Sequence, residues 1–527
     1  MEEPVLSTRG RRWMALLGIA LAIAAWGLAR GAELPPAACH LAATTVLMAV
    51  YWATQPIPIA VTSLIPIALY PLLGIAGARQ VCAAYGESNV FLYLGGFVIA
   101  LGLERWDLHR RIALNIVSAI GTSTKRLVYG FAFATAALSM WISNTATTLL
   151  MLPIALSLVQ MLEEELPGLA GSARGEALSG SLSRFTVALL LAVAFGATCG
   201  GLATFVGTPT NTSFRGFWER MVEAGAEPIS AGEWMLAFIP LSAAMLTGVC
   251  VMTTWRLRPL PGLDRLGREF CRSRLAELGP MSSGARWMLA VFLAAATLWM
   301  TREPIALSRG WEIPGWRAPL TEFIARRTSI PPASFPAVDD STVAILLVLA
   351  MFVLQGRRPG DAEPRPLMDW ATVQERLPWG VLLLFGGGFA MADAFRTTGL
   401  ADWLGGRMSS LSEGTPLWAM TAAVCSLVTL LSEFTSNVAT VNTALPMLAP
   451  LADGADVDPR LLLIPAAISA SFGFMLPVAT PPNAIVYGTG RVPVRQMMLY
   501  GFALDVLGVV LIVLFSMTIL PAVFVGG

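Results

Sequence analysis

Ser143-Asn144-Thr145 and Ser436-Asn437-Val438 are the two stretches that decide the fold, because each lies inside an otherwise apolar segment. A second polar break follows each of them. In Gly207-Thr208-Pro209-Thr210-Asn211 the threonine Thr208 lies 65 residues after Ser143, and in Ala479-Thr480-Pro481-Pro482-Asn483 the threonine Thr480 lies 44 residues after Ser436. Short polar side chains and prolines are costly inside a membrane unless they line a cavity. Matching segments of this kind in two halves of a chain indicate the binding site of a membrane transporter.

The composition is that of an integral membrane protein. Of 527 residues, 55% are hydrophobic and only 13% are charged, and the mean hydropathy is +0.66. A net charge of +1 without a block of basic residues gives no indication of nucleic acid binding. The six cysteines show no CxxC spacing, so we expect buried, inert thiols and neither disulfides nor a metal site.

Eleven segments are long and apolar enough to span a bilayer as helices. They cover about 13–30, 38–55, 57–77, 90–106, 184–214, 232–255, 285–301, 341–356, 378–397, 460–488 and 497–523. Two further apolar segments, 130–160 and 415–451, carry the Ser-Asn pairs near their middles and are predicted to be re-entrant helical hairpins. The first segment lacks a small-residue cleavage site and is therefore predicted to be a retained helix rather than a signal peptide.

Arginine placement predicts the orientation. With Arg9, Arg11 and Arg12 cytoplasmic, four further arginine-rich connections fall on the same side, as the positive-inside rule requires. These connections lie within residues 105–126, 256–286, 357–376 and 491–495. The 302–340 segment, placed outside with five arginines, is the exception, although long segments cross regardless of charge. An odd number of spans puts the C-terminus outside.

The two halves repeat one another. Leu94-Gly95-Gly96-Phe97 matches Gly386-Gly387-Gly388-Phe389 at an offset of 292, and the Ser-Asn pairs match at 293. We expect these glycines to form close helix-packing surfaces. About five spans and one hairpin per repeat give successive repeats opposite orientations, which is the inverted topology of many secondary transporters. The predicted divisions are an N-terminal segment with the first helix (1–36), a first repeat (37–260), a cytoplasmic linker (261–284) and a second repeat (285–527).

The motifs fit a small anion together with a hard cation. Ser and Thr hydroxyls and Asn amides donate to carboxylate or sulfate oxygens and also coordinate cations. Helix N-termini favour anions, and carbonyls freed at the proline breaks beside Gly207 and Ala479 suit sodium. A lone Ser-Asn-Thr usually makes hydrogen bonds between helices. Two copies, each paired with a Thr-Pro break in an inverted repeat, favour a binding site instead.

Several motifs resemble the divalent anion:sodium symporter family of sodium-coupled dicarboxylate, citrate and sulfate carriers and related exchangers. They are Met140-Trp141-Ile142-Ser143-Asn144-Thr145-Ala146-Thr147-Thr148, Gly200-Gly201-Leu202-Ala203-Thr204 running into Gly207-Thr208-Pro209, Leu94-Gly95-Gly96-Phe97 through Arg111, and Thr480-Pro481-Pro482-Asn483-Ala484-Ile485-Val486 with Gly488. The resemblance covers roughly residues 40–525.

The resemblance implies a homodimer whose protomers each have a scaffold and a mobile transport domain that moves as an elevator. It implies one sodium site at Ser139, Ser143, Asn144 and Gly207, and another at Ser432, Thr435, Asn437 and Ala479. It also implies that the substrate meets Ser143, Asn144, Thr145, Ser436, Asn437, Val438, Thr480 and Pro481.

Two residues depart from the family pattern, and one carboxylate stands out. Val438 stands at the third position of the second Ser-Asn motif, where threonine is common in the family. The replacement removes one hydroxyl donor, so the identity of the substrate is left undetermined. Thr210 replaces the second proline of the Pro-Pro-Asn motif, so the sequence does not determine the backbone geometry of that helix break. Glu433 lies next to Ser432 in the second hairpin, either as a proton or sodium group or in a hydrogen-bonded structural role.

The sequence therefore predicts an all-α polytopic transporter of the bacterial inner membrane for small dianions. Sodium-coupled symport of C4-dicarboxylates is the main prediction; an exchanger, or a sodium-coupled citrate or sulfate carrier, is the alternative. No organic cofactor is expected. An integral membrane enzyme would need an acid–base or metal cluster, and the sequence has no HExxH, Cys/His cluster or Ser/His/Asp arrangement. A channel would conduct without saturating with substrate.

Overall fold

A computed structural model describes residues 8–165, 172–223, 225–308, 311–328, 338–361, 363–404, 406 and 414–525. Parts of the predicted divisions lie outside these ranges. They are residues 1–7 of the N-terminal segment, residues 166–171 and 224 of the first repeat, and residues 309–310, 329–337, 362, 405, 407–413 and 526–527 of the second repeat.

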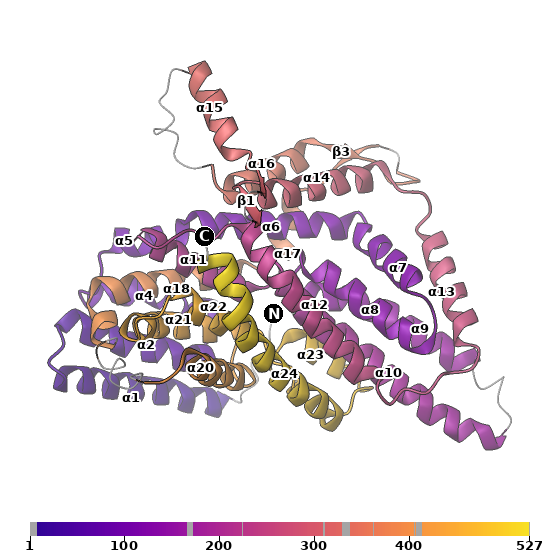
Figure 1. The fold of residues 1–527 in the computed structure, drawn as a ribbon, viewed down its shortest axis with the longest axis horizontal. Helices are drawn as coiled ribbons and strands as arrows, with labels where there is room; N and C mark the ends of the chain where they lie inside the picture. Colours follow the sequence, from indigo (N-terminus) through magenta and orange to yellow (C-terminus); the bar gives the residue numbers. More distant parts are fainter. Residues whose placement is uncertain are drawn as a thin grey trace.

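The described chain is almost entirely helical (Figure 1). In the first half the helices are α1 (Thr8–Gly31), α2 (Pro36–Thr54), α3 (Ile59–Thr62), α4 (Ile65–Leu72), α5 (Ala78–Ala83), η1 (Ala84–Gly86), α6 (Ser88–Arg105), α7 (Leu108–Ile120), α8 (Thr124–Ser139), α9 (Asn144–Glu165), α10 (Ser172–Gly201), α11 (Pro209–Glu223), α12 (Ala231–Thr254) and α13 (Leu263–Glu277).

In the second half the helices are α14 (Ser283–Met300), α15 (Arg317–Thr328), α16 (Asp340–Val353), α17 (Trp370–Arg376), α18 (Trp379–Thr397), α20 (Leu417–Ser432), α21 (Asn437–Gly454), α22 (Arg460–Ser469), α23 (Pro481–Tyr487) and α24 (Val494–Leu520), followed by the π-helical turn η4 (Pro521–Val525). In the described part of the chain, the departures from an all-α structure are two small antiparallel ribbons, β1 (Ile305–Ser308) with β2 (Trp311–Ile313) and β3 (Gln355–Gly356) with β4 (Arg365–Pro366).

Within the described ranges, eight helices are long and apolar enough to cross a membrane, or nine if the bent pair α17–α18 counts as one span. The sequence predicted eleven. The segment predicted as 57–77 is divided into α3 and α4, and α16 has only 14 residues. The segment predicted as 460–488 is split into α22 and α23. The protein is therefore a polytopic helical membrane protein, and the count of eleven stays a prediction.

Each polar stretch joins two packed helices. Helix α8 ends at Ser139 and α9 begins at Asn144, while α20 ends at Ser432 and α21 begins at Asn437. The two helices of each pair contact one another. Prediction and structure therefore agree on a turn at each Ser-Asn, and the depth of these turns in a bilayer stays a prediction.

Both Thr-Pro motifs interrupt a helix. Helix α10 ends at Gly201 and α11 begins at Pro209, and α22 ends at Ser469 and α23 begins at Pro481. Proline lacks an N–H and has a fixed φ, so it suits the first position of a helix and cannot continue the preceding one. The carbonyls of residues 202–207 and 470–479 accept no i→i+4 backbone hydrogen bond, whereas those of Thr208 and Thr480 already accept from the helices that follow.

Helices α8–α12 and α20–α24 pack in the same pattern. Helix α8 contacts α10 and α12 as α20 contacts α22 and α24, and α10 packs on α12 as α22 packs on α24. Between the halves, α23 packs on α9 and α10, and α11 packs on α21 and α22. Figure 1 shows α12 and α24, which are in contact, side by side at the centre of the molecule.

The paired glycines lie at close helix contacts, as predicted. A Cβ built on Gly95 would lie 2.5 Å from Cβ of Ala344 in α16. One built on Gly387 would lie 2.7 Å from the carbonyl oxygen of Ser63, and one on Gly388 would lie 2.6 Å from Cγ of Asn442. Any side chain at these positions would push the helices apart.

Three of the four connections predicted to be cytoplasmic meet on one face. Contacts join them in three places: Arg105 Nη1 to Thr372 Oγ1 at 3.0 Å, Arg111 Nη2 to the Leu278 carbonyl oxygen at 3.1 Å, and Arg358 Nη2 to Asp107 Oδ2 at 3.2 Å. In the fourth connection, Arg491 binds Glu163 near the end of α9, with Nη2 3.1 Å from Oε2.

Candidate functional site

The two hairpin turns are closed by the same hydrogen bond. Ser139 Oγ donates to Asn144 Oδ1 at 2.7 Å, and Ser432 Oγ donates to Asn437 Oδ1 at 3.0 Å, in each case across five residues. Both serines are fully buried. Each asparagine begins the second helix of its hairpin, so its side-chain oxygen is held at a helix N-terminus.

The first hairpin and the first helix break form an oxygen-rich cradle. A Cβ built on Gly207 would lie 2.6 Å from the Gly201 carbonyl oxygen and 3.0 Å from that of Ser139. One built on Gly201 would lie 2.5 Å from Asn144 Oδ1 and 3.2 Å from the Gly207 carbonyl oxygen. Four oxygens thus surround two glycines that have no room for a side chain. This is a donor set that suits sodium, since hard cations prefer oxygen ligands.

Thr204 ties this cradle to the hairpin turn. Its hydroxyl donates to the carbonyl oxygen of Met140 and accepts a hydrogen bond from the Gly207 N–H at 3.0 Å. Thr204 ends the Gly200–Thr204 motif, and its two contacts join the hairpin turn to the break.

The second hairpin and the second break meet in a similar way. The carbonyl oxygen of Ala470 lies 2.6 Å from Ser432 Oγ, so the one hydroxyl hydrogen of Ser432 is shared between this oxygen and Asn437 Oδ1. A Cβ built on Gly473 would lie 3.1 Å from Cβ of Ala479 and 3.5 Å from the Ser432 carbonyl oxygen. Thr480 caps α23 by accepting a hydrogen bond from the Asn483 N–H. Of the predicted residues, Ser432, Asn437, Ala479 and Thr480 therefore lie around this break.

The other predicted site residues either make hydrogen bonds only within their own hairpin or have no contact that identifies a binding site. Thr435 bonds to the Leu431 carbonyl oxygen at 2.9 Å and to Thr440 Oγ1 at 2.6 Å. Ser143 Oγ accepts from the Ala146 N–H at 3.3 Å. Thr145, Ser436 and Val438 are half-buried at the starts of α9 and α21, and Pro481 is exposed.

Thr210, the departure from Pro-Pro-Asn, links the two halves. Its hydroxyl is 2.6 Å from Ser471 Oγ, in the loop of the second break, and both side chains are buried. The break before α11 is retained with threonine at this position. The substitution therefore adds a hydrogen bond between the repeats and leaves the break in place.

Glu433 binds the backbone of the second break. Its Oε1 and Oε2 accept hydrogen bonds from the N–H groups of Met475 and Leu476, both at 2.9 Å. Asp505 of α24 accepts from the N–H of Phe474 in the same loop at 3.4 Å. Of the roles left open for Glu433, these contacts are those of a hydrogen-bonded structural group.

Two asparagines outside the predicted set hold the broken helices. Asn211 Nδ2 donates to the carbonyl oxygens of Gly201 (3.2 Å), Leu202 (3.2 Å) and Thr204 (2.8 Å). Asn483 Nδ2 donates to those of Gly473 (2.9 Å) and Leu476 (3.1 Å). Their common place, two residues after the proline that starts each helix, was the signal in the sequence that could have identified them.

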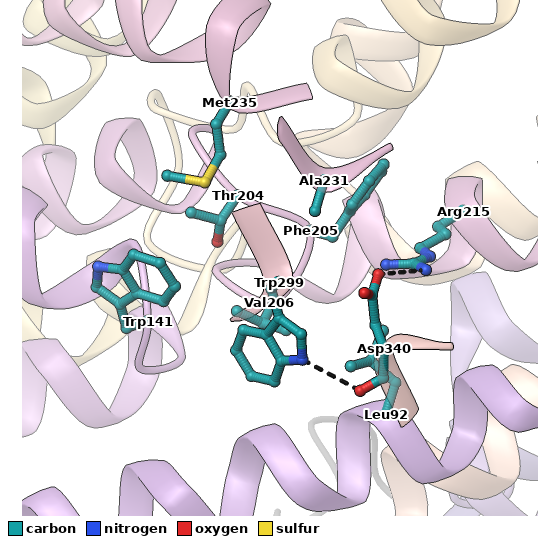
Figure 2. Close-up of a pocket in the computed structure, with 10 residues that line it drawn as sticks. All are labelled: Leu92, Trp141, Thr204, Phe205, Val206, Arg215, Ala231, Met235, Trp299 and Asp340. Atoms are coloured by element: carbon teal, nitrogen blue, oxygen red, sulfur yellow. Dashed lines mark hydrogen bonds and ion pairs between the residues drawn. The ribbon is translucent and has the colours of Figure 1, made fainter. Parts of the chain in front are cut away.

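A pocket lies beside the first break (Figure 2). It is lined by Leu92, Trp141, Thr204, Phe205, Val206, Arg215, Ala231, Met235, Trp299 and Asp340. Arg215 Nη2 lies 2.7 Å from Asp340 Oδ2, and Trp299 Nε1 donates to the Asp340 carbonyl oxygen at 3.1 Å. None of the predicted binding residues lines it. Its lining residues come from α6, α14 and α16 and, facing them, from the first hairpin turn, the loop of the first break, α11 and α12.

Similar proteins identify the family. The family described as "Sodium:sulfate symporter transmembrane region" matches residues 9–525. A sodium-dependent dicarboxylate transporter SdcS of Staphylococcus saprophyticus is 37% identical over 486 residues, 91% of this chain and 86% of that protein. The SdcS of Staphylococcus aureus (strain bovine RF122 / ET3-1) is 36% identical over 501 residues, 93% of this chain and 88% of that protein.

Among solved structures, Neisseria gonorrhoeae MtrF has a similar fold, with a TM-score of 0.55 at 11% identity over 92% of this chain and 94% of that chain. The family match spans nearly the whole chain, including both hairpins and both helix breaks. This chain therefore belongs to the sodium:sulfate symporter family, the divalent anion:sodium symporters.

Proposed function

We propose that this protein is a sodium-coupled symporter of small dicarboxylates such as succinate, malate and fumarate. The observation that carries the proposal is the duplicated site, in which a Ser–Asn hairpin turn meets a helix broken before Thr-Pro in each half. The relatives named sodium-dependent dicarboxylate transporters, 36–37% identical over most of the chain, support the same substrate and ion.

The substrate is proposed to bind between the two hairpin turns and the two breaks. Helices α9, α21 and α11 all begin there, and their free N–H groups and positive dipole ends favour carboxylates. The residues proposed to contact the dianion are Ser143, Asn144, Thr145, Ser436, Asn437, Val438, Thr480 and Pro481. Hydroxyls and amides bind the anion without a fixed positive charge, so cotransported cations are needed to offset its two negative charges.

Two sodium ions are proposed to supply that charge. The first would be held by Ser139, Ser143, Asn144 and Gly207, and the second by Ser432, Thr435, Asn437 and Ala479. The four-oxygen cradle around Gly201 and Gly207 supports the first site. The hydrogen bonds of Ser432 with Asn437 and Ala470 support the second.

The proposed architecture is an inverted repeat of eleven spans and two re-entrant hairpins, divided at 1–36, 37–260, 261–284 and 285–527. The equivalent packing of α8–α12 and α20–α24 supports the repeat. The contacts among three arginine-rich connections support their location on one face, proposed as cytoplasmic together with the N-terminus. The C-terminus is then outside, in a bacterial inner membrane.

Transport is proposed to occur by an elevator movement in a homodimer. The hairpins with α10–α12 and α22–α24 would move against a scaffold that includes α6, α14 and α16. The pocket of Figure 2 lies at this boundary and is crossed by the ion pair of Arg215 with Asp340. The two side chains are only 8% and 1% exposed, so their separation during movement would require water or new partners.

Uptake of labelled succinate into proteoliposomes tests the proposal. We expect uptake that saturates with succinate and requires an inward sodium gradient. Equal uptake with and without sodium, stimulated by dicarboxylate inside the vesicles, would indicate an exchanger instead. Because the family description names sulfate, sulfate is the second candidate. It would replace succinate in the proposal if it drove the larger sodium-dependent uptake.

A further inference from the structure

Asn211 and Asn483 occupy equivalent places in the two halves and make equivalent contacts. Each is fully buried, and each Nδ2 donates to the carbonyl oxygens of the residues ten and seven positions before it. For Asn211 these are Gly201 and Thr204, and for Asn483 they are Gly473 and Leu476. The two loops differ in sequence and length, yet an asparagine amide fastens both with the same hydrogen-bond pattern.

An amide NH2 group is well suited to this position. Where a helix is interrupted, its last carbonyls lose their backbone donors, and a buried carbonyl without a donor is costly. The NH2 group has two hydrogens and can bind two carbonyls at once, which fixes their relative positions. In both asparagines Oδ1 is buried and has no hydrogen-bond partner within the described ranges. The NH2 group, and not the oxygen, therefore makes the contacts that hold the loop.

At each break, one of the carbonyls bound by the asparagine belongs to a glycine beside a proposed sodium ligand. The Gly201 oxygen, bound by Asn211, lies 2.6 Å from the Cβ position of Gly207. Gly473, bound by Asn483, approaches Ala479 and the Ser432 carbonyl oxygen. Gly207 and Ala479 are proposed sodium ligands, so each asparagine controls the loop that faces one ion.

We propose that Asn211 and Asn483 are positioning residues for the two sodium sites, each fixing the carbonyls of its broken helix at the spacing that sodium requires. The inference rests on the proposed sodium-coupled function. An isosteric aspartate would set a carboxylate against two or three carbonyl oxygens, so the loop would open and its cation affinity would fall.

Asn211→Asp and Asn483→Asp, compared with two matched controls, test this role. Ser242 donates to the Cys199 carbonyl oxygen at 2.8 Å, and Thr429 donates to that of Ser469 at 3.3 Å. Both bonds are buried and end on the helices just before the breaks. Ser242→Ala and Thr429→Val therefore remove comparable bonds without releasing the loops.

Two readouts are measured on purified, full-length protein: the sodium concentration that gives half of the maximal thermal stabilisation, and the sodium dependence of succinate uptake. Potassium replaces sodium to keep ionic strength constant. We expect both aspartate variants to raise the half-saturating sodium concentration by about tenfold or more, because each loses every hydrogen bond that the amide donates, and one such bond alone corresponds to about tenfold. The succinate KM at saturating sodium should stay within about twofold of wild type, and the controls should keep the wild-type sodium response.

Asn211→Ser and Asn483→Ser extend the test if an aspartate variant fails to fold, because serine keeps one donor. A serine variant should show a smaller shift in the same direction. If the variants fold and keep the wild-type half-saturating sodium concentration, the positioning role of the two asparagines is wrong, while sodium coupling itself is unaffected. A wild-type protein without any sodium response would overturn sodium coupling, and the positioning role with it.

Discussion

Gly201 is the residue at which the first cradle is most sensitive to added volume. We expect Gly201→Ala to raise the half-saturating sodium concentration for succinate uptake by about tenfold or more, because its methyl group would lie 2.5 Å from Asn144 Oδ1. Gly180, in the same helix, has nothing within 4 Å of its Cβ position, so Gly180→Ala is the matched control and should leave uptake unchanged. Wild-type sodium dependence in Gly201→Ala would mean that Asn144 does not hold an ion there.

Val438 is the residue at which the two halves differ in chemistry, since Thr145 occupies the equivalent place. Val438→Thr restores one hydroxyl of similar volume at the start of α21. We expect a roughly two- to tenfold change in the potency of sulfate or citrate as inhibitors of succinate uptake, the range expected for one hydrogen bond. Thr145→Val is the reciprocal variant and should also change the preference. Unchanged inhibition profiles in both variants would place these side chains away from the substrate.

For single residues, the sequence located the turns and helix breaks correctly but did not show which contacts the side chains there make. The offset of the Ser-Asn pairs and the paired prolines identified both turns and both breaks, because such residues are tolerated in apolar segments only under strong constraint. It did not assign roles to Asn211 and Asn483. Their hydrogen bonds are made to carbonyls ten residues earlier, which lie within reach only because the helix is interrupted between the two residues.

The breaks before α11 and α23 are joined by one side-chain hydrogen bond, between Thr210 and Ser471. Thr210→Val keeps the volume and removes the hydroxyl, leaving Ser471 Oγ buried and without this partner. We expect a loss of about 1–3 kcal/mol in stability, measured as a lower midpoint of thermal unfolding in detergent. Thr210→Ser is the control, because it keeps the hydroxyl. Equal stability of Thr210→Val and wild type would show that the two loops are held together by other contacts.

The length of the apolar segments predicted the position of most membrane-spanning helices correctly, but it was misleading where a helix is interrupted. The predicted spans 38–55 and 232–255 agree closely with α2 and α12. The segment predicted as 57–77 is divided because Ser63 and Leu64 turn the chain between α3 and α4, with the Ser63 carbonyl against Gly387. Hydropathy averages over about twenty residues and does not respond to such a contact from the other half of the chain.

For the whole molecule, the proposed movement can be stopped by one crosslink across the boundary of Figure 2. A Cβ built on Gly96 of α6 would lie 3.8 Å from Cβ of Val206, in the loop of the first break. This is the usual Cβ separation of a disulfide, about 3.8 Å. We expect the oxidised Gly96→Cys/Val206→Cys variant to lose succinate uptake and to recover it on reduction.

The crosslink is made in a Cys82→Ser background, because Cys82 is exposed whereas the other native cysteines are buried. The two single-cysteine variants control for the substitutions themselves and should transport under oxidising conditions. Full uptake by the crosslinked protein would contradict movement of the first break against α6.

Sodium-driven accumulation of labelled succinate in proteoliposomes, compared between wild type, Asn144→Ala and Asn437→Ala, tests the central claim most directly. With equal succinate on both sides and an inward sodium gradient, the wild type should raise internal succinate above its equilibrium level. Each alanine variant should abolish this accumulation while remaining folded, because each removes the oxygen held by Ser139 or Ser432. Asn115→Ala, at an exposed asparagine of α7, is the control and should transport normally. Accumulation at wild-type levels in either site variant would contradict a site built from both hairpin turns.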